Sequence, residues 1–325
     1  MTEDNTCRTY NGYDINGLGQ LKDGRGNIAP VTIILPTIAK QVIDEGGGVE
    51  EFLVKLDEMI HDAKDMLIER YEWILKQPMS SAKFLWENNS LAGFDGKTTE
   101  SAFKHGTLAI GQLGGAEALQ LLIGKNQTTK EGLELLKRIE KLYKDRCKEF
   151  KEYYKLNFGV YYSPAENLCH TALKKFRSKY GIIPNVSDKE FFTNSVHVPV
   201  WEKLNPFEKI DIEAQLANYS SAGCIVYTEL DSSAFNNLEA IEELVVYAMD
   251  KDVPYFAINL PNDTCNDCGF CGDVPNDVCP VCGGNDIKRL RRVTGYMTSD
   301  YKTAFNKGKQ QEVEQRFKHT EVRED

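Results

Sequence analysis

The sequence lacks several features that would place it in a broad class at once. It contains no run of about 18 consecutive apolar residues, so we expect no membrane-spanning segment. Its first residues, MTEDNTCRTY, have neither a basic start nor an apolar stretch, so we expect no secretory signal. Basic residues are in deficit, 39 against 49 acidic ones, which gives a formal charge of −10. This balance argues against a protein that coats DNA or an anionic membrane. Together with the missing secretory signal, we expect a cytoplasmic location.

The cysteine pattern also gives no indication of a disulfide framework. The chain has nine cysteines, an odd number, and they are spread unevenly, with five between positions 265 and 282. In a reduced compartment such a local cluster favours a metal site over a disulfide framework.

Apolar periodicity predicts an α/β fold. Short apolar segments that read as strands alternate with longer helical patterns, which implies parallel strands buried on both faces. We expect strands at 30–36, 158–162, 224–228 and 253–258, and helices at 49–77, 100–124, 129–154, 165–179 and 233–250.

The composition changes at Pro261, and the sequence predicts two domains, 1–260 and 261–325. The second contains two CxxC knuckles, which can place four thiolates around one tetrahedral ion. The glycine after each knuckle, Gly269 and Gly283, suits the tight turn that such a site needs. Four sulfur ligands leave no open position, so we predict a structural Zn²⁺ rather than a catalytic one. The ligands are expected to be Cys265, Cys268, Cys279 and Cys282.

Two questions stay open in this module. Cys271 is a fifth thiol, interpreted as a spare residue, although it could instead exchange with Cys268 as a ligand. The basic residues between Lys288 and Arg292 would suit a zinc ribbon that binds nucleic acid. The net acidity and the absence of interleaved aromatic residues in the ribbon argue against nucleic-acid binding.

Directly after the ribbon stands Arg291–Met297, RRVTGYM, which taken alone is only a turn sequence. Together with other motifs in order, it resembles the anaerobic (class III) ribonucleoside-triphosphate reductases. The motifs that carry the resemblance are Thr6–Thr9 (TCRT), Asp23–Ile28 (DGRGNI), Tyr161–Leu168 (YYSPAENL), Thr193–Val200 (TNSVHVPV), Leu204–Lys209 (LNPFEK) and Phe305–Lys309 (FNKGK).

The resemblance implies a fold and a chemistry. The fold would be half of a ten-stranded α/β barrel, with a C-terminal zinc ribbon and a glycyl radical loop. Gly295 would store the radical, which a separate activase with S-adenosylmethionine and an iron–sulfur cluster creates, and Cys7 would become the thiyl. The implied substrates are ribonucleoside triphosphates, with formate or a thiol as reductant. ATP and other effector nucleotides, a homodimer and a role in deoxyribonucleotide supply for DNA replication are implied as well.

Further site residues follow from the same motifs. Asn27 would present its amide to the ribose hydroxyls, although the bare residue reads as a turn asparagine. Glu166 and Tyr161 match the family's tyrosine-to-glutamate loop, where the carboxylate would accept the proton of the 3′-hydroxyl. Glu166 could instead only charge the start of a helix. Ser195 and His197 are expected to line or support the site, without an assigned role.

The chain departs from the family pattern in length. The first half-barrel and the N-terminal nucleotide-binding region are missing, so we expect either a split-gene subunit that needs an N-terminal companion chain or a truncated longer protein. The motifs would also suit a different glycyl radical enzyme, or a non-catalytic partner protein that carries a zinc ribbon and a radical domain. A pyruvate formate-lyase relative would show adjacent cysteines, and the sequence has no Cys-Cys pair.

Overall fold

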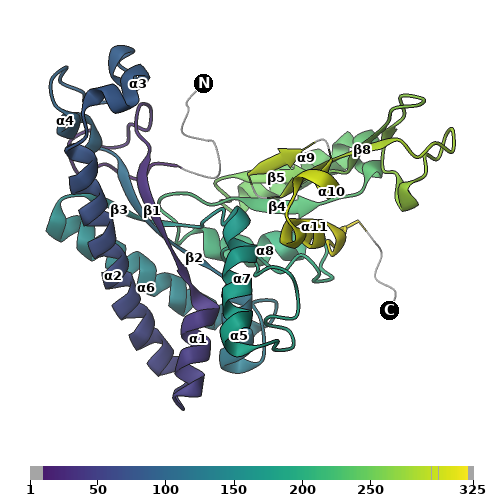
Figure 1. Cartoon of the computed structure of the whole chain (residues 1–325), viewed down its shortest axis with the longest axis horizontal. Helices are drawn as coiled ribbons and strands as arrows, with labels where there is room; N and C mark the ends of the chain where they lie inside the picture. The colour runs from purple at the N-terminus through teal and green to yellow at the C-terminus, as the bar shows by residue number, and fades with distance from the viewer. Residues whose placement is uncertain (1–9, 294, 299, 321–325) are drawn as a thin grey trace. The chain divides into compact units, whose positions relative to one another are not determined.

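The computed structural model describes residues 10–293, 295–298 and 300–320, and the chain divides into two compact units (Figure 1). The first comprises the described residues up to Ser163 together with Leu216–Cys224. The second comprises Pro164–Gln215 and the described residues from Ile225 onward. The proposed domain boundary between residues 260 and 261 stays a prediction.

A parallel sheet of three strands forms the centre of the first unit, in the order β1-β2-β3. Val31 pairs with Ile110, and Ile110 pairs in turn with Val160. Every residue of the middle strand is buried, as expected for a parallel sheet covered on both faces. The strands are β1 (Asn27–Ile34), β2 (Thr107–Leu113) and β3 (Asn157–Tyr161).

Two long helices pack against this sheet, α2 (Val49–Leu75) on β1 and α6 (Lys130–Tyr154) on β3 (Figure 1). Their apolar residues recur at helical spacing, so that each helix buries one stripe. The hydroxyl of Thr129 accepts the N–H of Gly132 at 3.1 Å and caps α6 as its sequence predicts. The shorter helices are α1 (Leu35–Asp44), α3 (Lys83–Glu87), α4 (Thr99–Phe103) and α5 (Gly115–Ile123).

The prediction of one helix over 100–124 is wrong. The structure has α4, then the strand β2, then α5 in this stretch. The sequence of β2, TLAIGQL, does not alternate because both of its faces are buried, and it therefore lacks the two-residue period of a half-exposed strand. Gly111 serves a close approach here, since a Cβ would lie 2.2 Å from the Ser163 hydroxyl.

The second unit contains the two-stranded parallel sheet of β4 (Val226–Glu229) and β5 (Phe256–Asn259). A cluster of buried apolar residues that includes Ile210, Val226 and Leu244 packs it against α8 (Pro206–Ala217) and α9 (Leu238–Asp250). Helix α7 (Glu166–Tyr180) begins this unit. The remaining strands and helices expected from the sequence are therefore confirmed, apart from small shifts of their ends.

A four-stranded antiparallel sheet follows β5, in the order β7-β6-β8-β9. Its apolar core is small and includes the cysteines themselves: Cys265, Val274, Cys279 and Ile287, with Phe270 beside them. Two short helices, α10 (Tyr301–Ala304) and α11 (Lys307–Glu314), come after it. The strands are β6 (Asn262–Cys265), β7 (Cys271–Gly272), β8 (Ile287–Val293) and β9 (Tyr296–Thr298).

These observations confirm the α/β class with parallel strands and a separate cysteine-containing sheet. In the part of the chain described, no helix is both long enough and apolar enough to cross a bilayer.

Candidate functional site

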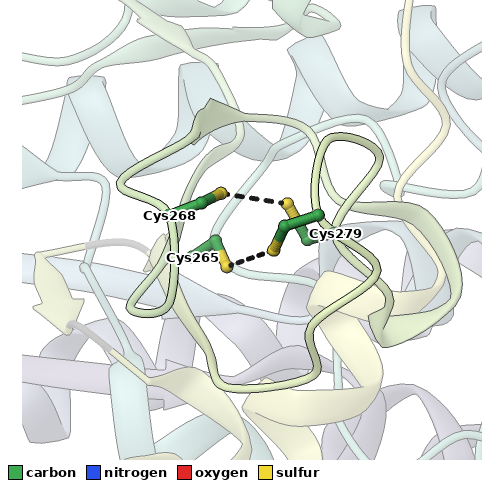
Figure 2. Close-up of side chains that lie close together, drawn as sticks. Cys265, Cys268 and Cys279 are labelled. Atoms are coloured by element: carbon green, nitrogen blue, oxygen red, sulfur yellow. Dashed lines mark hydrogen bonds between the residues drawn. The ribbon is translucent and has the colours of Figure 1, made fainter.

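Four cysteine sulfurs converge in the small antiparallel sheet, and all lie within 4.8 Å of one another. Figure 2 shows Cys268 facing Cys279, with Sγ atoms 3.6 Å apart, and Cys265 in the same cluster. The Sγ atoms of Cys265 and Cys282 are 3.7 Å apart. A regular tetrahedron with Zn–S bonds of about 2.3 Å requires S–S distances of about 3.8 Å. Two of the S–S distances are close to this value, so the four predicted ligands are compatible with a zinc site.

Two similar backbone turns build this cluster. Gly269 and Gly283 have φ of +76° and +75°, which only glycine adopts at little cost. The N–H of each glycine donates to the carbonyl of the first cysteine of its knuckle, Cys265 at 2.9 Å and Cys279 at 3.0 Å. Further N–H groups point at sulfur, from Val281 to Cys279 and from Gly284 to Cys282, both at 3.4 Å. Such donors stabilise thiolates, as a metal site requires.

Cys271 stands outside the cluster. Its exposed sulfur lies 3.7 Å from the Thr264 hydroxyl and is not part of the four-sulfur group. Arg291 pairs with the fully buried carboxylate of Asp263, and Arg289 pairs with Asp277. Much of the basic cluster thus serves internal ion pairs, which weakens the case for nucleic-acid binding.

Gly295 lies in an exposed turn that joins β8 to β9. These strands pair antiparallel, with Val293 opposite Tyr296, so Gly295 is at the tip of a tight hairpin. The hairpin begins on β8, which also pairs with β6 of the cysteine sheet. The four-cysteine cluster and Gly295 are thus connected through one continuous sheet.

Lys309 connects this hairpin to α7. Its ammonium lies 3.5 Å from the ring centroid of Tyr296 and 3.0 Å from the Asn167 Oδ1. Lys309 is only 4% exposed, so both interactions are largely shielded from water. The Asn306 amide donates to the same Asn167 oxygen at 2.8 Å. The residue beside Gly295 is therefore linked to the first turn of α7, the helix that begins at Glu166.

Gly308 explains the glycine of the FNKGK motif. A Cβ at this position would lie 2.7 Å from the Glu190 carbonyl oxygen and 2.9 Å from the His170 Cβ. Asn306 caps α11 by accepting the Lys309 N–H at 3.0 Å. The motif is therefore built to bring α11 close to α7.

In the first unit, Asn27 and Tyr161 both contact the backbone segment around Ala222. The Asn27 amide donates to the Ala222 carbonyl at 3.2 Å, and so does the backbone N–H of Tyr10. Tyr161 is buried against Ala222 and forms a bridge with Gly223. Cys7 lies outside the described residues, three positions before Tyr10. Tyr10, Asn27 and Tyr161 therefore share the loop around Ala222 as a contact. The sequence does not predict this loop as part of the site, because its short side chains include no catalytic or metal-binding group.

Among the described residues, the side-chain oxygen of Asn27 is buried and has no hydrogen-bond partner. A buried acceptor of this kind normally finds a donor, so this atom is available to a hydroxyl group of a ligand.

A buried ionic network surrounds His197. Glu213 on α8 accepts from Lys209 at 2.6 Å and lies 3.2 Å from the His197 Nδ1. Burial alone would raise the pKa of Glu213, but Lys209 and His197 lower it to about 2. The His197 ring lies 5.6 Å from the Tyr227 ring, over which Arg292 stacks at 5.1 Å. His197 is therefore connected through Tyr227 on β4 to Arg292 on β8. Ser195 is fully buried, with φ +52°.

Lys209 and Glu213 were not singled out from the sequence. Their spacing of four residues is typical of exposed helical ion pairs, and only tertiary packing reveals that both are buried.

Comparison with known proteins identifies the family to which the chain belongs. The family model for anaerobic ribonucleoside-triphosphate reductase matches residues 2–319. The proteins of that name from Escherichia coli (strain K12) and Enterobacteria phage T4 are each 32% identical to this chain and match 96% of it. The match covers 45% of the bacterial protein and 52% of the phage protein. The chain thus spans about half the length of these relatives.

Solved structures agree on the fold. An anaerobic ribonucleotide reductase superimposes with a TM-score of 0.72 at 22% identity, over 93% of this chain and 46% of that one. The Thermotoga maritima anaerobic ribonucleotide reductase in complex with dATP and CTP gives 0.67 at 23% identity, over 94% of this chain and 48% of that one. A different glycyl radical family is consequently not favoured. The chain belongs to the anaerobic ribonucleoside-triphosphate reductase family.

Proposed function

We propose that this chain is the radical-bearing C-terminal part of an anaerobic ribonucleoside-triphosphate reductase. One observation carries the proposal: Gly295 occupies the exposed tip of a hairpin that continues from the four-cysteine sheet, inside a family match over residues 2–319. The match covers about half of the length of each relative. An N-terminal part, from a companion chain or from the rest of a longer protein, would complete a ten-stranded barrel.

Gly295 is the proposed radical store. Glycine has no side chain, so its α-carbon can become planar and share an unpaired electron with the flanking amide groups. Its exposed position suits a separate activase, which would use S-adenosylmethionine and an iron–sulfur cluster to remove the α-hydrogen. The contact of Tyr296 with Lys309 would hold the hairpin in place.

Cys7 is the proposed thiyl. The Gly295 radical would regain its hydrogen from the Cys7 thiol, and the thiyl would then take the 3′ hydrogen of the ribose. Glu166 would accept the proton of the 3′-hydroxyl, and the 2′-hydroxyl would take up a proton and leave C2′ as water. The free acceptor of Asn27 supports a contact with a ribose hydroxyl, and Tyr161 would lie in the wall of the site.

The two electrons consumed per turnover would come from formate, oxidised to carbon dioxide, or from a thiol. We further propose a cytoplasmic homodimer that binds ATP and other effector nucleotides. The cysteine cluster would hold Zn²⁺ through Cys265, Cys268, Cys279 and Cys282, and its closed sulfur set gives it a structural role.

Electron paramagnetic resonance after anaerobic activation tests the radical assignment. We expect a glycyl doublet in the wild-type chain and in Met297→Ala, an exposed neighbour on the same hairpin, and no doublet in Gly295→Ala. Air should then cleave the activated chain at Gly295 and release a fragment of about 30 residues (325 − 295). A doublet that persists in Gly295→Ala would refute the proposal.

A further inference from the structure

A pocket of about 290 Å³ lies in the first unit, outside the residues proposed for catalysis. The loop after the N-terminus, α6 and the start of β3 form its walls. It is lined by Gly12, Tyr13, Arg25, Thr107, Lys144, Cys147, Lys148, Lys151, Asn157, Phe158 and Ser221. Its volume is near the lower limit for pockets that hold small ligands.

The lining carries four cations and no carboxylate, although the whole chain has a net charge of −10. Lys144, Lys148 and Lys151 follow each other at spacings of four and three, so they share one face of α6. Arg25 enters from the opposite loop and is 3% exposed. The carbonyls of Gly12, Leu21 and His105 accept its hydrogen bonds and hold the guanidinium in place.

Two carboxylates near the pocket have partners of their own. Asp14 accepts a hydrogen bond from Asn157 at 2.6 Å and lies 2.9 Å from the His105 Nδ1. Glu152 lies 4.0 Å from Lys148 at an exposed position. The structure, in the residues it describes, places no carboxylate within ion-pair distance of Lys144 or Lys151.

These two lysines instead contact neutral groups. The Lys144 ammonium donates to the Asn218 carbonyl at 3.0 Å and lies over the Tyr219 ring. The Lys151 ammonium donates to the Tyr13 carbonyl and lies over the Tyr13 ring. Burial, followed by repulsion from Arg25, lowers the pKa of Lys151, and the negative charge of Asp14 only partly opposes this shift. A bound anion would relieve both effects.

We propose that this pocket binds the phosphate groups of a small molecule, either free pyrophosphate or a nucleoside polyphosphate. Four cations that line one pocket match a ligand that carries more than one negative charge, and the burial of Arg25 strengthens a charge-assisted interaction there. The inference is independent of the radical chemistry, since none of the pocket residues has a proposed role there.

Titration calorimetry of the full 325-residue chain with pyrophosphate at low ionic strength tests the site. Pyrophosphate should bind the wild type, and the double variant Lys144→Gln/Lys151→Gln should weaken binding by about tenfold or more. Lys137→Gln/Lys141→Gln is the matched control, since it removes two lysines from the same helix outside the pocket and should bind as the wild type does. Far-ultraviolet circular dichroism checks that the variants are folded.

ATP and adenosine distinguish the two sources of phosphate. If ATP binds more tightly than pyrophosphate and loses affinity in the pocket variant, the ligand is a nucleotide. If ATP and pyrophosphate bind the wild type with similar affinity, both bind the pocket variant more weakly by the same factor, and adenosine does not bind, the phosphate chain alone is recognised. No pyrophosphate binding to the wild type, or equal binding to the pocket variant and the wild type, would overturn the proposal.

Discussion

At the scale of single residues, Lys309 ties together three motifs that lie far apart in the chain. It contacts Tyr296 beside the glycine and Asn167 in the first turn of α7, and it belongs to the FNKGK segment itself. A shielded cation–π contact contributes about 2 kcal/mol, and a charge-assisted hydrogen bond adds a similar amount. Lys309 is therefore a positioning residue for the hairpin.

We predict that Lys309→Ala loosens the hairpin. Hydrogen exchange of the amides in β9 should become faster, and the free energy of unfolding should fall by about 4 kcal/mol. Lys307→Ala, an exposed lysine on the same helix, is the control and should leave both quantities unchanged. Equal exchange rates in the two variants would contradict the role given to Lys309.

Glu140 makes a prediction about pH. It is fully buried on α6, and the Gln112 side chain donates to it at 2.6 Å. Burial, opposed by hydrogen bonds from Tyr162 and Gln112, raises the pKa of Glu140 from 4.5 to about 8. The folded protein therefore keeps this proton in a range where the unfolded chain loses it, and stability should fall as the pH rises from about 4.5 to 8.

Urea unfolding at several pH values measures this effect. A single group contributes a slope of up to about 1.4 kcal/mol per pH unit within that window. Glu140→Gln keeps the shape and cannot ionise, so its slope should be smaller than that of the wild type. Identical slopes would show that Glu140 is ionised in the folded chain.

At the scale of elements, the four-stranded sheet depends on its cysteines. Among the described residues, its core contains two of them with Val274, Ile287 and the ring of Phe270 beside them. So little apolar surface cannot compensate for the conformational entropy of ordering the sheet. Binding of a structural zinc supplies on the order of 10 kcal/mol in small modules. We therefore expect the position of the hairpin with Gly295 to depend on the proposed metal.

We predict about one equivalent of zinc in the purified chain, measured by elemental analysis. Cys279→Ser should lose it and lose the hydrogen-exchange protection of β6 and β8. Cys271→Ser, at the exposed cysteine outside the cluster, should retain both. Zinc loss in Cys271→Ser would instead support the exchange of ligands between Cys271 and Cys268.

At the scale of the whole molecule, the parallel sheets look incomplete. Among the described strands, β1 has one neighbour, β2, and β5 has one neighbour, β4. A closed barrel leaves no such edges. Helix α9 also exposes large apolar side chains, including Leu238 at 73% and Met249 at 68%. Both features agree with a chain that spans about half of its relatives.

We predict that the chain co-purifies with an N-terminal companion when the two are expressed together. The complex should reduce ribonucleoside triphosphates under anaerobic conditions after activation, whereas the chain alone should not. Size-exclusion chromatography and product analysis measure these outcomes. Full turnover by the isolated chain would refute the need for a companion.

The sequence alone determined the features that depend on local spacing. The two CxxC knuckles with their glycines, the hairpin glycine Gly295 and the long amphipathic helices could be predicted, because a few neighbouring residues specify each of them. Tertiary structure decided the rest. β2 could not be told from a helix, because burial on both faces removes its alternation. The links made by Lys309 and the cationic pocket arise where distant segments meet, and spacing along the chain carries no record of that contact. The pair of Lys209 with Glu213 lies on one helix, but its burial depends on the segments that pack over it.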